Sequence, residues 1–296
     1  MKRKFSTLLC VLVGAMALGT NVSAKEKTSV EFWKDPNLNE VNRLPMTTTF
    51  ATDGLKLSLS GLWKFNFNKD LNTRPTDFYR DGYDDSQWGT IPVPGLWDLN
   101  GYCDPIYVNT PYPWDGHFPN TPPIVPDEHN YVGQYRHNFF LGEEWKGQDI
   151  VLHIGSATSN VKVWVNGKEV GYSEDSKLEA RFDITKFVKL GENTIALEIF
   201  RWCDGTYVEC QDFWRYAGIA RDIYVFSRAK QRIENIHVSG DADGRYSIVA
   251  ETTSGVAKVR WQIVDAAGEI AASGDASVNV KDKSGNGFSC ARVEGG

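Results

Sequence analysis

The sequence is poor in the residues that build metal centres and disulfide frameworks. It has 5 cysteines and 5 histidines in 296 residues, with no Cys-x-x-Cys motif and no His-rich run. Zinc sites use such closely spaced ligands, so none is expected. Cys203 and Cys210 are close enough in sequence to pair across a turn, although a chain of this size can bury a sufficient core without disulfides. Their pairing stays open at the level of sequence.

Basic residues are also scarce. The chain has 32 Lys and Arg against 38 Asp and Glu, which gives a formal net charge of -6 at pH 7. Nucleic-acid binding requires clustered Lys and Arg that neutralise phosphates. The composition therefore argues against a nucleic-acid partner.

No long amphipathic helix can be read from the sequence after residue 24. Short runs of alternating apolar and polar residues recur instead, as is typical of strands with one buried face. Val165-Asn166-Gly167-Lys168 indicates a hairpin, because Asn-Gly readily adopts the positive φ angles of a type I′ turn. The runs that predict strands are 62–67, 135–140, 150–154, 161–165, 193–200 and 223–226. The sequence predicts an all-β fold, with a jelly-roll sandwich over residues 25–228.

The first 24 residues have the composition of a secretory signal peptide. Lys2, Arg3 and Lys4 precede an apolar stretch over 5–18, and residues 22–24 supply the small side chains that a signal peptidase reads. A transmembrane helix needs roughly 20 apolar residues, so a membrane anchor is the less favoured alternative. We expect residues 1–24 to be cleaved, the protein to be periplasmic or secreted, and no membrane partner. Cleavage would change the net charge from -6 to -9, because three basic residues leave and no acidic one.

The segment from Asn100 to Val132 is rich in Pro, Tyr and Asn and shows little periodicity. A loop of this length inside a compact domain is usually functional or disordered. Its many aromatic residues argue against disorder. We expect an ordered loop with a binding or interface role.

The composition changes after about Ser227. Residues 233–238, 246–251 and 258–264 predict three strands separated by Gly-rich turns. They resemble the start of an immunoglobulin-like sandwich, which needs about 100 residues and seven strands. The last residues, from Ser284 to Gly296, show no strand pattern. We therefore expect residues 229–296 to form a truncated immunoglobulin-like β-sandwich.

Several motifs are more specific than this patterning. The first motif is Arg201-Trp202-Cys203-Asp204-Gly205-Thr206-Tyr207, which continues through residues 211–215. The second motif runs from Gly101-Tyr102 through Pro105-Ile106-Tyr107-Val108-Asn109. An N-terminal arm over residues 25–55 carries the short motifs Phe32-Trp33 and Asn42-Arg43-Leu44-Pro45. Further short motifs lie at residues 61–65, 92–97, 165–167 and 182–185. Together these stretches resemble bacterial β-galactosidases of glycoside hydrolase family 2, over residues 30–270.

The resemblance implies roles for two residues. In the family, an Asn of the first loop and the Asp after Arg-Trp-x contribute to the galactose subsite, and these roles fall on Asn109 and Asp204. That Asp also helps hold a sodium ion, so Asp204 is the candidate metal ligand. Amide and carboxylate groups suit hydroxyl-rich sugars. Read without the resemblance, both residues could simply shape turns, and Trp202 and Trp214 are expected to lock the loop by packing.

The family's catalytic residues have no place in this chain. Retaining glycosidases use two carboxyl groups about 5 Å apart. In this family both are glutamates of a (β/α)₈ barrel, a fold of about 250 residues, which follows the immunoglobulin-like domain. We expect the chain alone to be inactive and to be the N-terminal part of an exported β-galactosidase that removes terminal β-D-galactose. The resemblance implies sodium and magnesium for the full-length enzyme, neither held fully by this chain, and it allows a homo-oligomer.

Two alternatives remain open. A stand-alone carbohydrate-binding module would need its own aromatic platform and a closed last domain, whereas an unfinished sheet leaves unpaired edges. A family 2 enzyme of other specificity, such as a β-glucuronidase or β-mannosidase, would share the motifs at 165–167 and 182–185. The run from Arg201 to Tyr207 resembles β-galactosidases and therefore favours the first interpretation.

Overall fold

The computed structural model describes residues 31–46, 54–209, 212–278 and 289–295. The predicted signal peptide, residues 1–24, lies outside these ranges, and so does Cys210, the proposed partner of Cys203. Within the described part, Cys103 and Cys203 are free thiols. No helix of the described residues is long and apolar enough to cross a membrane.

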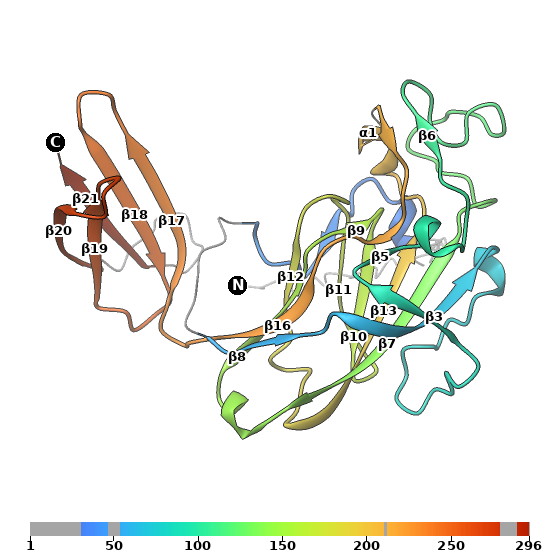
Figure 1. Ribbon diagram of the computed structural model, residues 1–296, viewed down its shortest axis with the longest axis horizontal. Coiled ribbons are helices and arrows are strands. Elements are labelled where there is room, and N and C mark those ends of the chain that lie inside the picture. The colour runs from blue at the N-terminus through green and yellow to red at the C-terminus, as the bar shows by residue number, and fades with distance from the viewer. Residues whose placement is uncertain (1–30, 47–53, 210–211, 279–288, 296) are drawn as a thin grey trace, which may run out of the picture. The chain divides into compact units, whose positions relative to one another are not determined.

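Strands make up most of the regular structure (Figure 1). The helical pieces are α1 (Thr206–Glu209) and the 3-10 turns η1 (Phe32–Lys34), η2 (Leu71–Thr73), η3 (Asp98–Asn100) and η4 (Glu143–Trp145). The strands are β1 (Glu40–Val41), β2 (Lys56–Ser58), β3 (Gly61–Asn68), β4 (Gly89–Val93), β5 (Gly95–Leu96), β6 (Tyr107–Val108), β7 (Val132–Leu141), β8 (Asp149–Ile154), β9 (Ala157–Thr158), β10 (Val161–Val165), β11 (Lys168–Ser173), β12 (Ala180–Asp183), β13 (Gly191–Phe200), β14 (Phe213–Trp214), β15 (Gly218–Ile219), β16 (Ile223–Arg228), β17 (Ile233–Gly240), β18 (Tyr246–Thr252), β19 (Lys258–Val264), β20 (Ile270–Ser277) and β21 (Ser289–Gly295).

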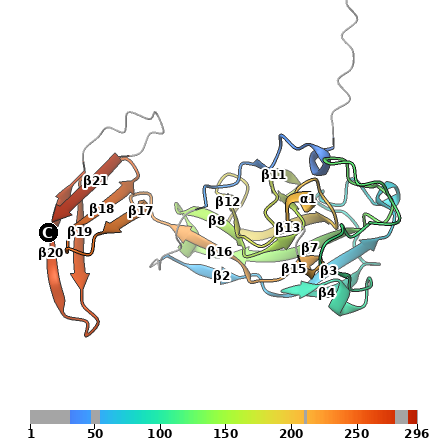
Figure 2. The ribbon, with the colours of Figure 1, turned by 90° about the horizontal axis from the view of Figure 1, so that it is seen from above.

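Two antiparallel sheets form a sandwich in the larger, N-terminal part of the described chain. The seven-stranded sheet has the order β1-β11-β10-β13-β7-β3-β4, and the four-stranded sheet has the order β12-β8-β16-β2. The strands of the smaller sheet follow one another in that order in Figure 2. Short strands outside the sandwich sheets form a three-stranded sheet, β5-β15-β9, and a two-stranded ribbon, β14-β6.

The core fills the space between these two sheets. In β3, Trp63 and Phe65 are 0% and 2% exposed, whereas Leu62 is 69% exposed, as strand alternation requires. Trp63 and Phe65 belong to one cluster of buried side chains that also contains Leu152 of β8 and Val225 of β16. Burial of this apolar surface is the main stabilising contribution to the sandwich.

The sequence-based prediction of an all-β sandwich is confirmed. All six predicted strands fall within β3, β7, β8, β10, β13 and β16. The predicted hairpin joins β10 to β11, with φ angles of 49° at Asn166 and 72° at Gly167. The jelly-roll connectivity and the domain boundaries remain predictions.

The C-terminal strands form a three-stranded sheet, β17-β18-β21, and a two-stranded sheet, β19-β20. The three predicted strands are present as β17, β18 and β19. The expectation that the last residues lack a strand was wrong, because β21 pairs along the whole of β18. Its sequence, Ser-Cys-Ala-Arg-Val-Glu-Gly, has weak alternation, and pairing with β18 supplies the backbone hydrogen bonds that order it.

Candidate functional site

The long loop predicted to be ordered contacts the segment that carries the Arg201–Tyr207 motif. Strand β6 of the loop pairs with β14, with Tyr107 opposite Trp214. The backbone N–H of Arg215 also donates to the carbonyl of Ile106 at 2.7 Å. Residues about a hundred positions apart are thus held side by side, and Asn109 directly follows the paired segment.

Asn109 is exposed at the end of β6. Its side chain makes no hydrogen bond to the residues that the structure describes, so it does not shape its own turn there. This disagrees with the reading of Asn109 as a purely local turn residue. The amide is free to hydrogen-bond an external group.

Asp204 lies between Cys203 and Gly205, two residues before the start of α1, and is only 8% exposed. Its backbone N–H donates to the carbonyl of Trp33 at 3.1 Å, and its carbonyl accepts from the N–H of Tyr207 at 3.1 Å. The backbone therefore does form the expected turn. The side chain has a different role, because Oδ1 is buried and has no hydrogen-bond partner among the described residues. Burial raises the pKa of this carboxyl group.

Glu174, which follows β11, lies against Asp204 and was not singled out from the sequence. It is 6% exposed, and its Oε1 accepts a hydrogen bond from the hydroxyl of Tyr172 at 2.7 Å. Burial, together with the neighbouring Asp204 carboxyl group, raises the pKa of Glu174 to about 8. A Cβ on Gly205 would lie 2.7 Å from Glu174 Oε2, so the glycine of the motif makes room for this contact. At neutral pH Glu174 keeps its proton and donates it to the Asp204 carboxylate.

The stability of the chain is expected to fall as the pH rises from about 4.5 to about 8. In this window the folded chain keeps the Glu174 proton and the unfolded chain has lost it, so the stabilisation present below pH 4.5 disappears by pH 8. Urea denaturation in sodium-free buffer at stepped pH measures this slope. The variant Glu174→Gln carries a non-titrating amide and should flatten it, and an unchanged slope in this variant would contradict the assignment.

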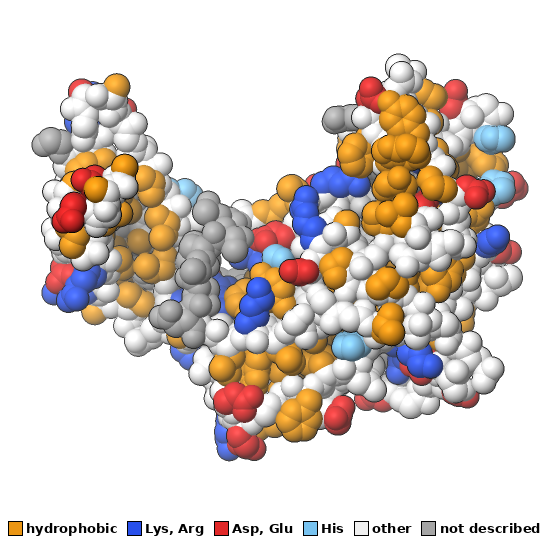
Figure 3. Space-filling view, in the orientation of Figure 1, with side chains coloured by type: hydrophobic (Ala, Val, Ile, Leu, Met, Phe, Trp, Pro, Cys, Tyr) orange, Lys and Arg blue, Asp and Glu red, His pale blue; other side chains and the backbone are white. Residues whose placement is uncertain are grey.

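An exposed aromatic surface covers the β6–β14 ribbon. Tyr107, Phe213 and Trp214 are 53%, 47% and 45% exposed, and Trp214 stacks on Tyr216 with ring centroids 5.5 Å apart. Hydrophobic side chains gather over the part of the surface that carries α1 and β6 (Figure 3). Trp202 packs inside, since it is 6% exposed, and Trp214 packs against Tyr107 and Tyr216 as predicted but leaves nearly half of its surface exposed. Half-exposed aromatic rings of this kind mark a binding surface.

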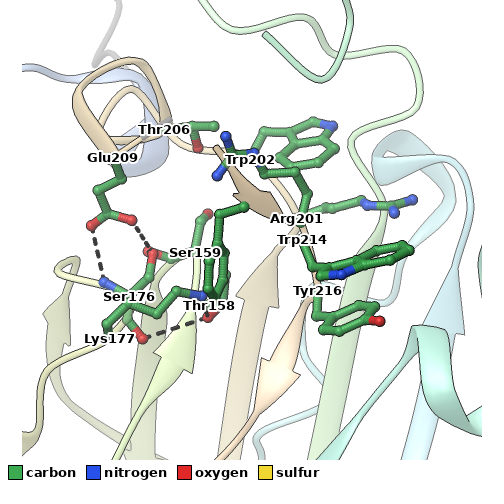
Figure 4. Close-up of a pocket in the computed structure, with 12 residues that line it drawn as sticks. Thr158, Ser159, Ser176, Lys177, Arg201, Trp202, Thr206, Glu209, Trp214 and Tyr216 are labelled. Atoms are coloured by element: carbon green, nitrogen blue, oxygen red, sulfur yellow. Dashed lines mark hydrogen bonds between the residues drawn. The ribbon is translucent and has the colours of Figure 1, made fainter. Parts of the chain in front are cut away.

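A small hollow lies between this ribbon, α1 and the turn after β11 (Figure 4). Glu209 accepts hydrogen bonds from the N–H and the hydroxyl of Ser176, and Lys177 Nζ donates to Thr158 Oγ1 at 3.3 Å. The cavity volume is about 30 Å³. Because a water molecule needs about 10–15 Å³ of such volume, the hollow has room for water but not for a sugar.

The chain matches the family model described as "Glycosyl hydrolases family 2, sugar binding domain" over residues 56–229. A β-galactosidase of Halalkalibacterium halodurans is 34% identical over 275 residues, which is 86% of this chain and 27% of the relative. A β-galactosidase of Priestia megaterium is 41% identical over 189 residues, 64% of this chain and 18% of the relative. The chain thus spans only about a quarter or less of the curated relatives that it matches.

The solved structures with this fold include β-glucuronidases. One is β-glucuronidase 2 of Bacteroides uniformis bound covalently to cyclophellitol-6-carboxylate aziridine, with a TM-score of 0.61 and 19% identity over 82% of this chain and 28% of that chain. Another is the Bifidobacterium dentium β-glucuronidase complexed with coumarin-3-O-glucuronide, with a TM-score of 0.59 and 17% identity over 84% of this chain and 43% of that chain. At such low identity these likenesses establish the fold alone.

Proposed function

This chain belongs to glycoside hydrolase family 2, and from that membership we propose that it is the N-terminal, sugar-binding part of an exported β-galactosidase. The observation that carries the proposal is its 34% and 41% identity to β-galactosidases over most of the chain. The signal-peptide pattern of residues 1–24 supports export. The rest of the relatives' length, roughly three quarters to four fifths of it, supports a catalytic part that lies outside this chain.

In this proposal Asn109 and Asp204 bind the galactose hydroxyls. Asn109 offers an exposed amide with one acceptor and two donor hydrogens, and Asp204 offers a buried oxygen without a partner. Bond cleavage is assigned to two glutamates of the missing barrel, acting as nucleophile and acid/base in a retaining mechanism. The contribution of this chain is to orient the sugar and strengthen contacts in the transition state.

The unpartnered Asp204 Oδ1 also suits a sodium ion, because a buried carboxylate oxygen is a good ligand for a hard cation. The described residues contain no cluster of three or more Asp, Glu, His or Cys that would complete such a site. Asp204 would therefore be one ligand, with the others supplied by the catalytic part and by the sugar. Sodium would add a positive charge beside the substrate hydroxyls. Magnesium is proposed for the catalytic part only.

In this proposal the exposed aromatic surface, formed by Tyr107, Phe213 and Trp214, contacts the catalytic part. These side chains lie on the same ribbon as Asn109, so a protein that covers them would also be placed next to the sugar subsite. A β-glucuronidase specificity is the second candidate, because the motifs at 165–167 and 182–185 resemble those of such enzymes as well. The β-galactosidase relatives are the closer in sequence and favour galactose.

The assay that tests this proposal is hydrolysis of nitrophenyl β-D-galactoside and nitrophenyl β-D-glucuronide by the purified chain and by the full-length enzyme. We expect no turnover by the chain and preferential hydrolysis of the galactoside by the full-length enzyme. Preference for the glucuronide would establish the other specificity. Turnover by the chain that survives further purification would place the catalytic carboxylates within these residues.

A further inference from the structure

A second, much larger cavity is lined mainly by the segment from Asp98 to Tyr131. Its volume is about 650 Å³, within the roughly 300–1,000 Å³ of typical small-molecule sites. Buried Trp114, Arg201 and Trp202 line it, and exposed side chains including His117 surround them. Neither Asn109 nor Asp204 lines this cavity. It is therefore distinct from the subsite proposed above.

Two buried donors line the cavity. Trp114 is 3% exposed and Arg201 is 4% exposed. Arg201 Nε lacks a hydrogen-bond partner among the described residues, and the Trp114 indole has only the Tyr207 side chain as a partner. The other end of the guanidinium is fixed, because Nη2 donates to Asp98 Oδ1 and to the carbonyl of Asp104, each at 3.0 Å. Buried donors are normally satisfied, so a ligand with acceptor atoms is expected here.

The charges that line the cavity argue against an anionic ligand. Arg201 is neutralised by its ion pair with Asp98, and Lys69 is opposed by Asp104 and Glu128. A free phosphate or carboxylate would meet no surplus of positive charge. A purely cationic ligand could not accept a hydrogen bond from the unpartnered Arg201 Nε either. A neutral molecule with many hydroxyl groups meets both conditions.

Aromatic rings supply the remaining recognition. Trp114 and Trp202 pack edge to face with centroids 5.9 Å apart. Phe118, His129 and Tyr131 follow one another along the wall, with the His129 centroid 6.0 Å from that of Phe118 and 6.2 Å from that of Tyr131. Such rings cover the apolar faces of sugar rings, while the donors and imidazoles orient hydroxyl groups.

We propose that this cavity is a second carbohydrate site, which binds a neutral mono- or disaccharide through Trp114, Arg201 and the aromatic wall. Every residue that lines this cavity belongs to this chain. It would hold a saccharide next to the galactose subsite without cleaving it.

The test is calorimetric titration of the purified full chain with lactose, repeated with D-glucuronate, and supported by ligand-observed NMR. Lactose is expected to bind and glucuronate to bind more weakly. Trp114→Phe keeps the ring and removes the donor, so it should weaken lactose binding about threefold to tenfold. His117→Ala changes only the exposed rim and should also weaken binding. Trp214→Phe, the same exchange outside the cavity, should leave the affinity unchanged.

Three results would overturn the proposal. The first is the absence of lactose binding up to the solubility limit of lactose. The second is tighter binding of glucuronate than of lactose. The third is lactose binding that is abolished by Asn109→Ala but left intact by Trp114→Phe and His117→Ala. The last would move the sugar to the Asn109 loop. None of these results depends on turnover. The proposal of a second carbohydrate site can therefore fail while the β-galactosidase assignment stands, and the β-galactosidase assignment can fail while the second site stands.

Discussion

Replacing Asp98 with alanine is expected to lower the free energy of unfolding by about 3–5 kcal/mol. The Asp98 side chain is 0% exposed. It accepts from Arg201 Nη2 at 3.0 Å and from the N–H of Ala217 at 2.9 Å. Without it, the Arg201 guanidinium would stay buried and charged with no counter-ion, which costs much more than the pair itself contributes. Equilibrium urea denaturation of the chain measures the change.

Two variants control for this prediction. Asp104→Ala removes a neighbouring exposed carboxylate but keeps the backbone carbonyl that accepts from Arg201, so it should change the unfolding free energy by less than about 0.5 kcal/mol. Asp98→Ala combined with Arg201→Met removes both charges and should recover part of the loss. A loss below about 1 kcal/mol in Asp98→Ala alone would show that the pair does not hold η3 against β13 and β15.

The sandwich could be predicted from sequence because its strands carry their own signal. In β3 the alternation of Trp63 and Phe65 with Lys64 and Asn66 is a local signal, and Asn166-Gly167 specifies its turn without help from the rest of the chain. The two-residue strands β5, β9 and β15 carry no such pattern, since only tertiary pairing defines them. Strand β21 was missed for the same reason.

The candidate site was only partly predictable. Asn109 and Asp204 came from motifs, and the sequence could not show that one is exposed and the other buried with an unpartnered oxygen. Glu174 was missed because its contact with Asp204 spans thirty residues and depends on burial. Trp214 was expected to lock the loop by packing, and it does pack on Tyr107 and Tyr216, but the sequence could not show that 45% of its surface stays exposed on a two-stranded ribbon.

Replacing Asp204 with alanine is expected to lower kcat/KM of the full-length enzyme for nitrophenyl β-D-galactoside by about a hundredfold. A carboxylate oxygen held in a buried site without a protein partner is preorganised to receive a sugar hydroxyl or a cation. Asp204→Asn keeps one oxygen and loses the charge, so its loss should be smaller. Asp222→Ala removes an exposed carboxylate and should leave the activity unchanged. A near-normal rate in Asp204→Ala would refute the assignment.

The unfolding free energy of the same variant separates a binding role from a structural one. The Asp204 turn is held by backbone hydrogen bonds to Trp33 and Tyr207, and alanine would keep both. The variant also removes the acceptor of the Glu174 proton, and a buried donor left without an acceptor costs about 1–3 kcal/mol. Asp204→Ala should therefore lower the free energy of unfolding by about this amount and remain folded at 25 °C, while its activity falls about a hundredfold. A loss of stability well above about 3 kcal/mol would show that Asp204 acts by holding the loop and not by binding the sugar.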